Sequence, residues 1–211
     1  EELRQLLAEL KKIYAMAERG EFVIEEGVED VHSQVELMLT RNLGDIGKKI
    51  HSGRSRNDQV ATDTRLGVKA LAKELMEANL ELRHVLVDAA KKYDKVILPG
   101  YTHMQHAQPV LLSHHLLAYS WMFARDFTRL KAAFDAADNC PLGAAALAGT
   151  SYPLDRQMTA AELGFAGVIP NSLDAVSDRD FLLDLHYAGS VMAMHLSRLS
   201  EEIVLWSSSE F

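Results

Sequence analysis

The chain has 211 residues, 48% of them hydrophobic and 25% charged, and its formal net charge is −8. This composition is ordinary for a folded globular protein with one or two hydrophobic cores. The acidic balance argues against a general nucleic-acid binder, which needs a basic surface to meet the phosphate backbone. A small anionic ligand remains open, because a local cluster of arginines can bind one inside an acidic protein.

A single cysteine, Cys140, excludes an internal disulfide and fits a reducing compartment such as the cytoplasm. No apolar run approaches the roughly 18 residues that a membrane span needs. The chain begins with a charged, amphipathic stretch that is no signal peptide, and it ends without a helix stop signal. We therefore expect both ends to be cuts within a longer protein.

Helical periodicity dominates the tracts between the five prolines. Residues 2–18 place leucines and Ile13 on one face, and Gly20 then breaks the helix. Residues 29–43 predict a second short helix with a stripe of valines and leucines. Apolar residues at alternating spacings of four and three predict three helices of about 30 residues or more, packed as a bundle. These segments are residues 57–92, 109–138 and 177–208.

Asn57 is a good N-cap for the first long helix, and Asp58 suits the positive end of its dipole. The alternation typical of a half-buried strand is missing, so we expect no strand and an all-α fold. Long rods with apolar seams usually pack against other rods, often from other subunits. We expect residues 1–53 to be the end of an N-terminal helical domain and residues 54–211 to be an incomplete central long-helix bundle.

The first polar connection, residues 47–59, brings Arg54 and Arg56 to the start of a long helix, where the dipole is already positive. Backbone N–H groups and guanidinium forks both suit carboxylates, so this turn is a candidate anion site. A solvated basic turn with Asn57 as a plain cap explains the same residues, and charge alone favours this simpler interpretation.

The second connection, residues 99–109, holds a threonine, two amides, His103 and His106 between two prolines. Histidine is the side chain best suited to move protons near neutral pH, although a loop histidine is more often merely exposed. A zinc site is disfavoured, because the further cysteine or histidine ligands of a closed site are missing. The small residues of the third connection, residues 140–150, allow close backbone approach to a ligand or, more simply, to another helix.

Together these segments resemble the signatures of the argininosuccinate lyases, a branch of the fumarase/aspartase superfamily. Gly53–Val60 resembles the first signature of this family. Gly100–Gln105, together with Ala107–Pro109, resembles the second. One motif could arise by chance, but the ordered set covers nearly all of the chain from residue 29 onward. The first signature also separates the chain from the adenylosuccinate lyases and the fumarases. Supporting stretches are residues 29–32, 143–150 and 171–181.

Two parts of the family pattern are absent from this sequence. One is the third signature, a Gly-Ser-Ser-x-Met-Pro-x-Lys-x-Asn-Pro loop that supplies a catalytic serine and a lysine. The other is the family's extreme N-terminal segment, which also contacts substrate. We therefore expect the chain to be a fragment of an argininosuccinate lyase that is inactive alone.

The resemblance implies reversible cleavage of argininosuccinate into arginine and fumarate, with no metal and no organic cofactor. His103 is then the proton-transfer residue, either as the base or as the group that orients the absent serine. Arg56 and Asn57 bind the succinyl carboxylates, and Thr102 donates a hydrogen bond to the substrate. Weaker substrate-binding candidates are Ser55 and Gln108, and candidates for a supporting role are His32 and Arg179.

The alternatives are a catalytically silent, δ-crystallin-like structural protein and a helical bundle that serves only oligomerisation. Geometry bears on the assembly, because a helix of about 36 residues spans ~54 Å and places Asn57 and His103 at opposite ends. A substrate roughly 10–15 Å long cannot bridge them. If both residues bind one substrate, antiparallel rods from different subunits must meet, and closed symmetry then favours the homotetramer that the resemblance also implies.

Overall fold

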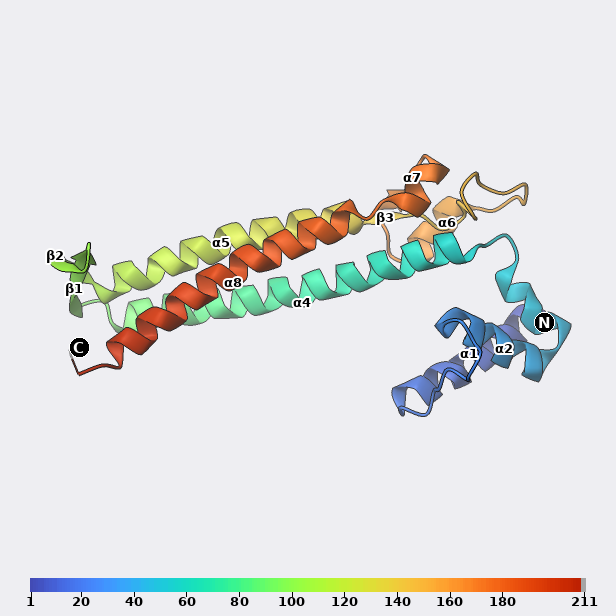
Figure 1. Ribbon diagram of the computed structural model, residues 1–211, viewed down its shortest axis with the longest axis horizontal. Coiled ribbons are helices and arrows are strands. Elements are labelled where there is room, and N and C mark those ends of the chain that lie inside the picture. Colours follow the sequence, from blue (N-terminus) through green and yellow to red (C-terminus); the bar gives the residue numbers. More distant parts are fainter. Residues whose placement is uncertain (210–211) are drawn as a thin grey trace.

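The computed structural model describes residues 1–209, which fold mainly into helices, with two small sheets. Three long helices lie side by side as an elongated bundle, and the N-terminal helices form a separate cluster near one end of it (Figure 1). The all-α class expected from the sequence is confirmed. The long helices are α4 (Arg56–Lys92), α5 (Leu112–Ala137) and α8 (Asp180–Trp206). The N-terminal cluster consists of α1 (Glu2–Glu18), α2 (Val31–Leu43), α3 (Asp45–Lys48) and the 3-10 turn η1 (Lys49–His51).

Helix α4 runs for 37 residues without interruption, because no proline falls inside it and a capping box fixes its start. The cap is Ser55 rather than Asn57, which corrects the expectation from the sequence. The Ser55 hydroxyl accepts a hydrogen bond from the Asn57 N–H at 3.3 Å, and the Asp58 carboxylate accepts one from the Ser55 N–H at 2.9 Å. Serine and asparagine cap equally well, and Ser55 is the residue with the extended backbone that a cap requires.

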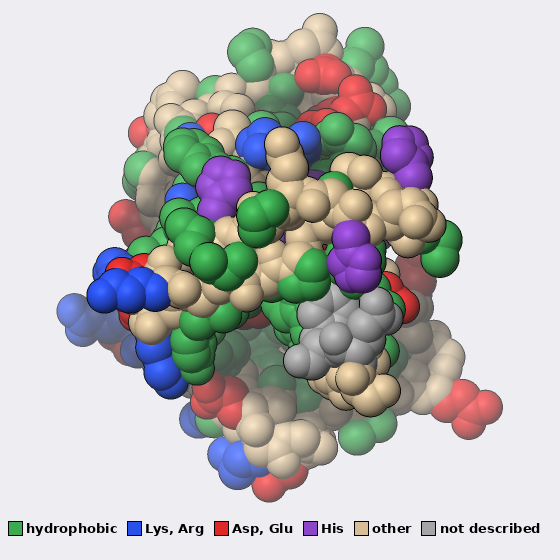
Figure 2. All heavy atoms as spheres, turned by 90° about the vertical axis from the view of Figure 1, so that its left-hand side faces the viewer, with side chains coloured by type: hydrophobic (Ala, Val, Ile, Leu, Met, Phe, Trp, Pro, Cys, Tyr) green, Lys and Arg blue, Asp and Glu red, His purple; other side chains and the backbone are tan. Residues whose placement is uncertain are grey.

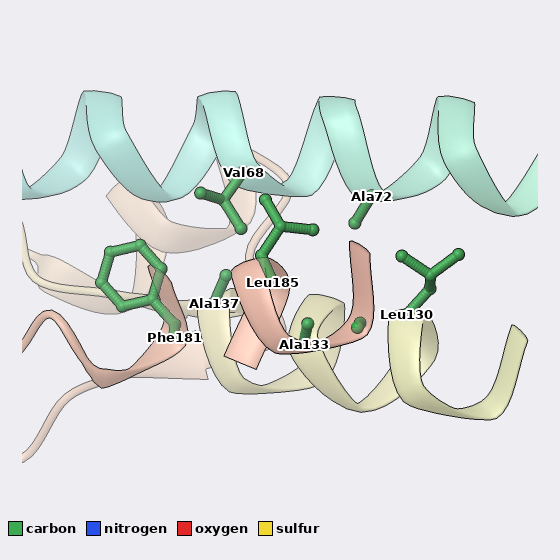
Figure 3. Packing of buried hydrophobic residues seen from close by; sticks show 8 residues of the cluster. Val68, Ala72, Leu130, Ala133, Ala137, Phe181 and Leu185 are labelled. Carbon is green, nitrogen blue, oxygen red and sulfur yellow. The ribbon is translucent and has the colours of Figure 1, made fainter. Parts of the chain in front are cut away.

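Small and large side chains alternate in the core where the three long helices meet (Figure 3). The alanines let the helices approach closely, and the larger side chains fill the remaining space. This cluster consists of Val68 and Ala72 from α4, Leu130, Ala133 and Ala137 from α5, and Phe181, Leu185 and Ala188 from α8. A second cluster around Tyr119 and Phe123 extends the core along the bundle. The N-terminal helices have a core of their own around Leu39, which is fully buried.

Buried charged side chains cross-link the bundle. Asp126 on α5 is fully buried, and its carboxylate meets Nδ1 of His195 on α8 at 2.7 Å and the guanidinium of Arg129 at 3.1 Å. Arg65 on α4, which is also almost fully buried, pairs with Asp178, which lies just before α8. An isolated charge would be costly in these positions, so the pairs fix which faces of the helices meet.

Two strand pairs contradict the expectation of no strand. The longer pair is a hairpin that directly follows α4, with a bulge between Pro99 and Tyr101. The sequence pattern did not predict this hairpin, because a proline normally interrupts a strand. Here Pro99 and Pro109 lie opposite each other and both are exposed. Helix α5 consequently begins at Leu112 rather than at residue 109. The antiparallel hairpin is β1 (Ile97–Thr102) with β2 (Gln105–Leu111), and the parallel pair is β3 (Asn139–Cys140) with β4 (Gly167–Val168).

Two short helices, α6 (Arg156–Glu162) and α7 (Ser172–Ser177), lie at the end of the bundle where α4 begins (Figure 1). Helix α8 begins three residues later than expected, because Asp178 has an extended backbone and ends α7. Within residues 1–209, no helix combines the length and the apolar character of a membrane span. The same residues contain no cluster of three or more histidine, cysteine or acidic side chains that could hold a metal ion.

Candidate active site

The start of α4 and the loop after β3 are held together by Asp58. The Asp58 Oδ2 accepts hydrogen bonds from the backbone N–H groups of Gly143 at 3.0 Å and Ala145 at 2.8 Å. The Asn57 Nδ2 donates to the Ala146 carbonyl at 2.8 Å, and the Asn57 side chain remains exposed. The sequence indicates Asp58 only as a partner for the helix dipole, because a local pattern does not show contacts with residues 85 and 87 positions away.

The backbone of this loop needs small residues. Gly143 and Ala145 both have a positive φ, 93° and 54°, which a larger side chain adopts at a cost. A Cβ at Gly143 would lie 2.8 Å from the Cγ of Arg156, whose guanidinium donates to the carbonyls of Leu142 and Ile169. The close backbone approach expected from residues 140–150 is therefore an approach to α4 and to Arg156.

Arg56 is surrounded by groups from the protein itself. Its Nε lies 2.9 Å from the Asp30 Oδ2, and its Nη1 lies 3.3 Å from the Glu36 Oε1. Nη1 also donates to the Gln59 Oε1 at 2.7 Å, and Nη2 donates to the Ser33 Oγ at 3.0 Å. The Ser33 N–H, with the nearby charge of Arg56, lowers the pKa of Asp30, so this carboxyl is ionised at neutral pH.

The two residues expected to support the site bind neighbouring protein groups. The Nε2 of His32 lies 2.6 Å from the Asp63 Oδ2 on α4. The Nη1 of Arg179 donates to the carbonyls of Val176 at 3.2 Å and Asp178 at 2.6 Å. His32 thus ties α2 to α4, and Arg179 closes the turn between α7 and α8.

Arg54 differs from Arg56, because its guanidinium has no ion pair or hydrogen bond within residues 1–209. It lines a cavity of about 410 Å³ together with Thr62 and Leu66 of α4 and side chains of α6. At 3.6 residues per turn, Thr62 and Leu66 lie on the face of α4 opposite to Asn57. This cavity and Asn57 therefore belong to different surfaces of the molecule.

The second group of predicted site residues lies on the β1–β2 hairpin. His103 and Met104 form its two-residue turn, with φ of 53° and 58°, and Thr102 pairs with Gln105. A positive φ at both central residues is typical of a type I′ turn, which normally contains glycine or asparagine. Every residue from 101 to 109 is exposed, so the hairpin presents His103 at its tip.

Contacts within the hairpin fix its backbone. A Cβ at Gly100 would lie 2.5 Å from the Gln108 carbonyl, so the two strands cross too closely here for a side chain. The hydroxyl of Tyr101 lies 2.9 Å from the Nε2 of His106. Gln108 itself is an exposed residue of β2, on the same hairpin as Thr102 and His103.

A histidine–glutamate contact lies beneath the hairpin. His115 on α5 contacts Glu202 on α8, and both line a cavity of about 310 Å³ whose other walls are hairpin residues, Leu205 and Trp206. Burial, together with the neighbouring Glu202 carboxylate, raises the pKa of Tyr119 to about 12. The helical pattern predicts His115 as a packing or surface residue, and it gives no sign that Glu202 is its partner.

The two groups of site residues lie at opposite ends of α4 (Figure 1). At 1.5 Å per residue, this 37-residue helix spans ~55 Å. Figure 2 looks onto the hairpin end and shows histidine side chains exposed there. Ser55, Arg56 and Asn57 are therefore together at one end, Thr102, His103 and Gln108 are together at the other, and a single chain does not unite them.

Comparison with known proteins identifies the class of protein that has this fold and these two groups of site residues. The sequence profile of the lyase family matches residues 1–211, and the chain belongs to this family. Its long-helix fold is that of the fumarase/aspartase superfamily.

Similar curated relatives carry the name argininosuccinate lyase. The protein from Symbiobacterium thermophilum is 52% identical over 202 residues, which is 96% of this chain and 44% of the relative. The protein from Carboxydothermus hydrogenoformans is 50% identical over 211 residues, which is 100% of this chain and 46% of the relative. The chain thus spans less than half the length of these relatives.

Among solved structures, EDDS lyase in complex with formate is similar to 99% of this chain, with a TM-score of 0.89 and 33% identity, over 41% of its own length. A variant of EDDS lyase with bound fumarate gives a TM-score of 0.88 and 32% identity, with the same coverage. The arrangement of α4, α5 and α8 is therefore shared with enzymes of the class.

Proposed function

We propose that the full-length protein containing this chain is an argininosuccinate lyase, which cleaves argininosuccinate reversibly into arginine and fumarate. The observation that carries this proposal is an identity of about half with argininosuccinate lyases over the whole chain, with both polar motifs intact. A variant of EDDS lyase, a neighbour in fold, has been solved with fumarate bound, which supports fumarate as the product.

The proposed chemistry is an elimination in two stages. A base removes a proton from the carbon next to a carboxylate, which leaves a carbanion whose charge is shared by the carboxylate oxygens. Fixed hydrogen-bond donors around those oxygens are then the largest source of rate. The C–N bond next breaks as an acid assists the guanidino leaving group. Metal or organic cofactors have no part in this proposal.

The proposed roles follow from where the side chains lie. His103 moves the proton, because it is an exposed imidazole at the tip of a fixed turn. Thr102 and Asn57 donate to the substrate carboxylates. Ser55 and Gln108 are further substrate-binding candidates, although the Ser55 hydroxyl also caps α4.

We propose that the active protein is a homotetramer whose sites are shared between subunits. The proposed site needs both groups of residues, the one around Asn57 and the one around His103. These two groups lie ~55 Å apart in one chain. The long helices also expose large apolar side chains that antiparallel rods from other subunits would cover. They include Leu71 and Val85 on α4, Trp121 on α5, and Leu183, Tyr187 and Val204 on α8.

We also propose a cytoplasmic location. Cys140 is a buried free thiol, and burial raises its pKa, so it behaves as a packing residue. This use of cysteine fits a reducing compartment.

The test of the activity is an assay of the full-length protein with argininosuccinate, in which fumarate is followed by its absorbance near 240 nm. We expect fumarate and arginine in equal amounts. A folded, tetrameric protein that releases no fumarate would instead support the crystallin-like structural role.

A further inference from the structure

The part played by Arg56 is open to a new assignment, because its guanidinium is already occupied. An arginine side chain has five N–H donors. In the structure these donors meet Asp30, Glu36, Gln59 and Ser33, so at most one N–H is left over. A substrate carboxylate at Arg56 would have to approach a cation that two protein carboxylates already surround.

The partners of Arg56 are themselves fixed. The Asp30 carboxylate caps α2 by accepting from the Ser33 N–H at 2.7 Å. The Glu36 Oε1 is shared between Arg56 and the Nδ1 of His51, which lies 2.8 Å away. The side chains of Arg56, Asp30 and Glu36 are only 25%, 27% and 28% exposed, so water screens these contacts less than an ion pair on the open surface.

The contacts of Arg56 join two separate parts of the chain. Asp30, Ser33 and Glu36 belong to α2 and its cap, whereas Gln59 lies on the first turn of α4. The next residue along the chain is Asn57, whose amide reaches the Ala146 carbonyl. Any shift of the first turn of α4 against α2 would therefore move the Asn57 amide.

We propose that Arg56 is a positioning residue, which locks the start of α2 to the start of α4 and so holds Asn57 in place for the substrate. The proposal rests on the proposed function. Misplacing a group that contacts substrate by about 1 Å can lower the rate by about 100-fold. The lock thus matters for turnover although Arg56 does not bind the substrate.

The test is a double-mutant cycle in the full-length protein with Arg56→Gln, Asp30→Asn and both changes together. If Arg56 acts as a lock, each single variant lowers kcat by about 10- to 100-fold, and the double variant is no worse than the poorer single one. If Arg56 instead binds the substrate, Asp30→Asn frees its guanidinium and leaves KM unchanged or lower, while Arg56→Gln raises KM. That pattern, or losses that multiply in the double variant, overturns the proposal.

The matched control is Arg41→Gln, which breaks another arginine–carboxylate pair of α2. Arg41 binds Glu25 at 2.5 Å and 2.9 Å, away from α4. Loss of the Arg41–Glu25 pair is expected to change kcat less than about twofold, because exposed ion pairs contribute little. All kcat values are taken well below each melting temperature and with folding checked by circular dichroism. A purely structural role predicts wild-type kcat for every folded variant and so overturns the proposal.

Failure of the proposed function is recognised separately, because the wild-type protein then releases no fumarate. In that case the melting temperatures of the wild type, Arg56→Gln, Asp30→Asn and the double variant are compared. Shifts that are not additive support a lock between Arg56 and Asp30, and additive shifts overturn it.

Discussion

At the scale of single residues, the least expected feature is the turn at His103 and Met104. Both are non-glycine residues with a left-handed backbone conformation, which costs about 1–3 kcal/mol of conformational strain each. Such strain persists only where the surroundings impose it, and the close crossing at Gly100 and the Tyr101–His106 contact supply that constraint. The sequence predicted the polarity of this segment and the candidate histidine. It did not predict the turn, which depends on pairing across the hairpin.

Replacing His103 separates chemistry from folding. His103→Asn in the full-length protein should lower kcat by about 10²–10⁴-fold, because a general acid or base is lost. The melting temperature should hardly change, since asparagine tolerates a left-handed backbone and the residue is exposed. Met104→Asn is the control, because it changes the same turn without removing an imidazole. Equal loss of activity in both variants would assign the effect to the turn.

Tyr119 gives a test by titration. Its pKa is raised to about 12 by burial and by Glu202, so the folded state holds this proton more tightly than the unfolded state. The resulting stabilisation is present below the ordinary tyrosine pKa of about 10 and is lost as the pH rises from there through 12. Absorbance at about 295 nm, where the ionised phenol absorbs, should show a tyrosine step near pH 12. Tyr119→Phe should remove that step, and its persistence would contradict the assignment.

At the scale of elements, the apolar periodicity predicted the long helices because each buries one continuous stripe. Their ends were less accurate, because they depend on contacts that periodicity does not describe. The cap at Ser55 and the break at Asp178 each shifted a predicted boundary. The partners of Arg56 and Asp58 could not be predicted either, since they come from α2 and from the loop after β3.

The buried pair between α5 and α8 should contribute strongly to stability. Asp126→Ala would leave His195 buried without its carboxylate, and breaking a buried pair in this way costs about 3–5 kcal/mol. The control is Lys131→Ala, which breaks the exposed pair with Asp135 on the same helix at a cost of about 0–1 kcal/mol. Urea unfolding measures both changes. Similar midpoints for the two variants would show that the buried pair is dispensable.

At the scale of the whole molecule, the elongated bundle holds the motif around Asn57 and the motif around His103 at opposite ends (Figure 1). The sequence resemblance suggests that these two motifs act on one substrate. We propose that residues 1–53 are the end of an N-terminal domain and that residues 54–211 form the central bundle. This division is supported by the separate hydrophobic cores around Leu39 and along the long helices. The distance along α4 could be predicted from the absence of proline, whereas the surfaces that meet other subunits could not.

The central claim is that one active site uses Asn57 from one subunit and His103 from another. The most direct measurement mixes two inactive full-length variants, Asn57→Leu and His103→Asn, after dissociation and reassembly. Some sites in the hybrid tetramers then carry neither change, and we expect fumarate release to reappear at up to about a quarter of wild-type activity for random mixing of shared sites. Each variant taken through the same procedure alone should stay inactive. Hybrids that are shown to form, for instance by differently tagged subunits, and that still release no fumarate would contradict the shared site.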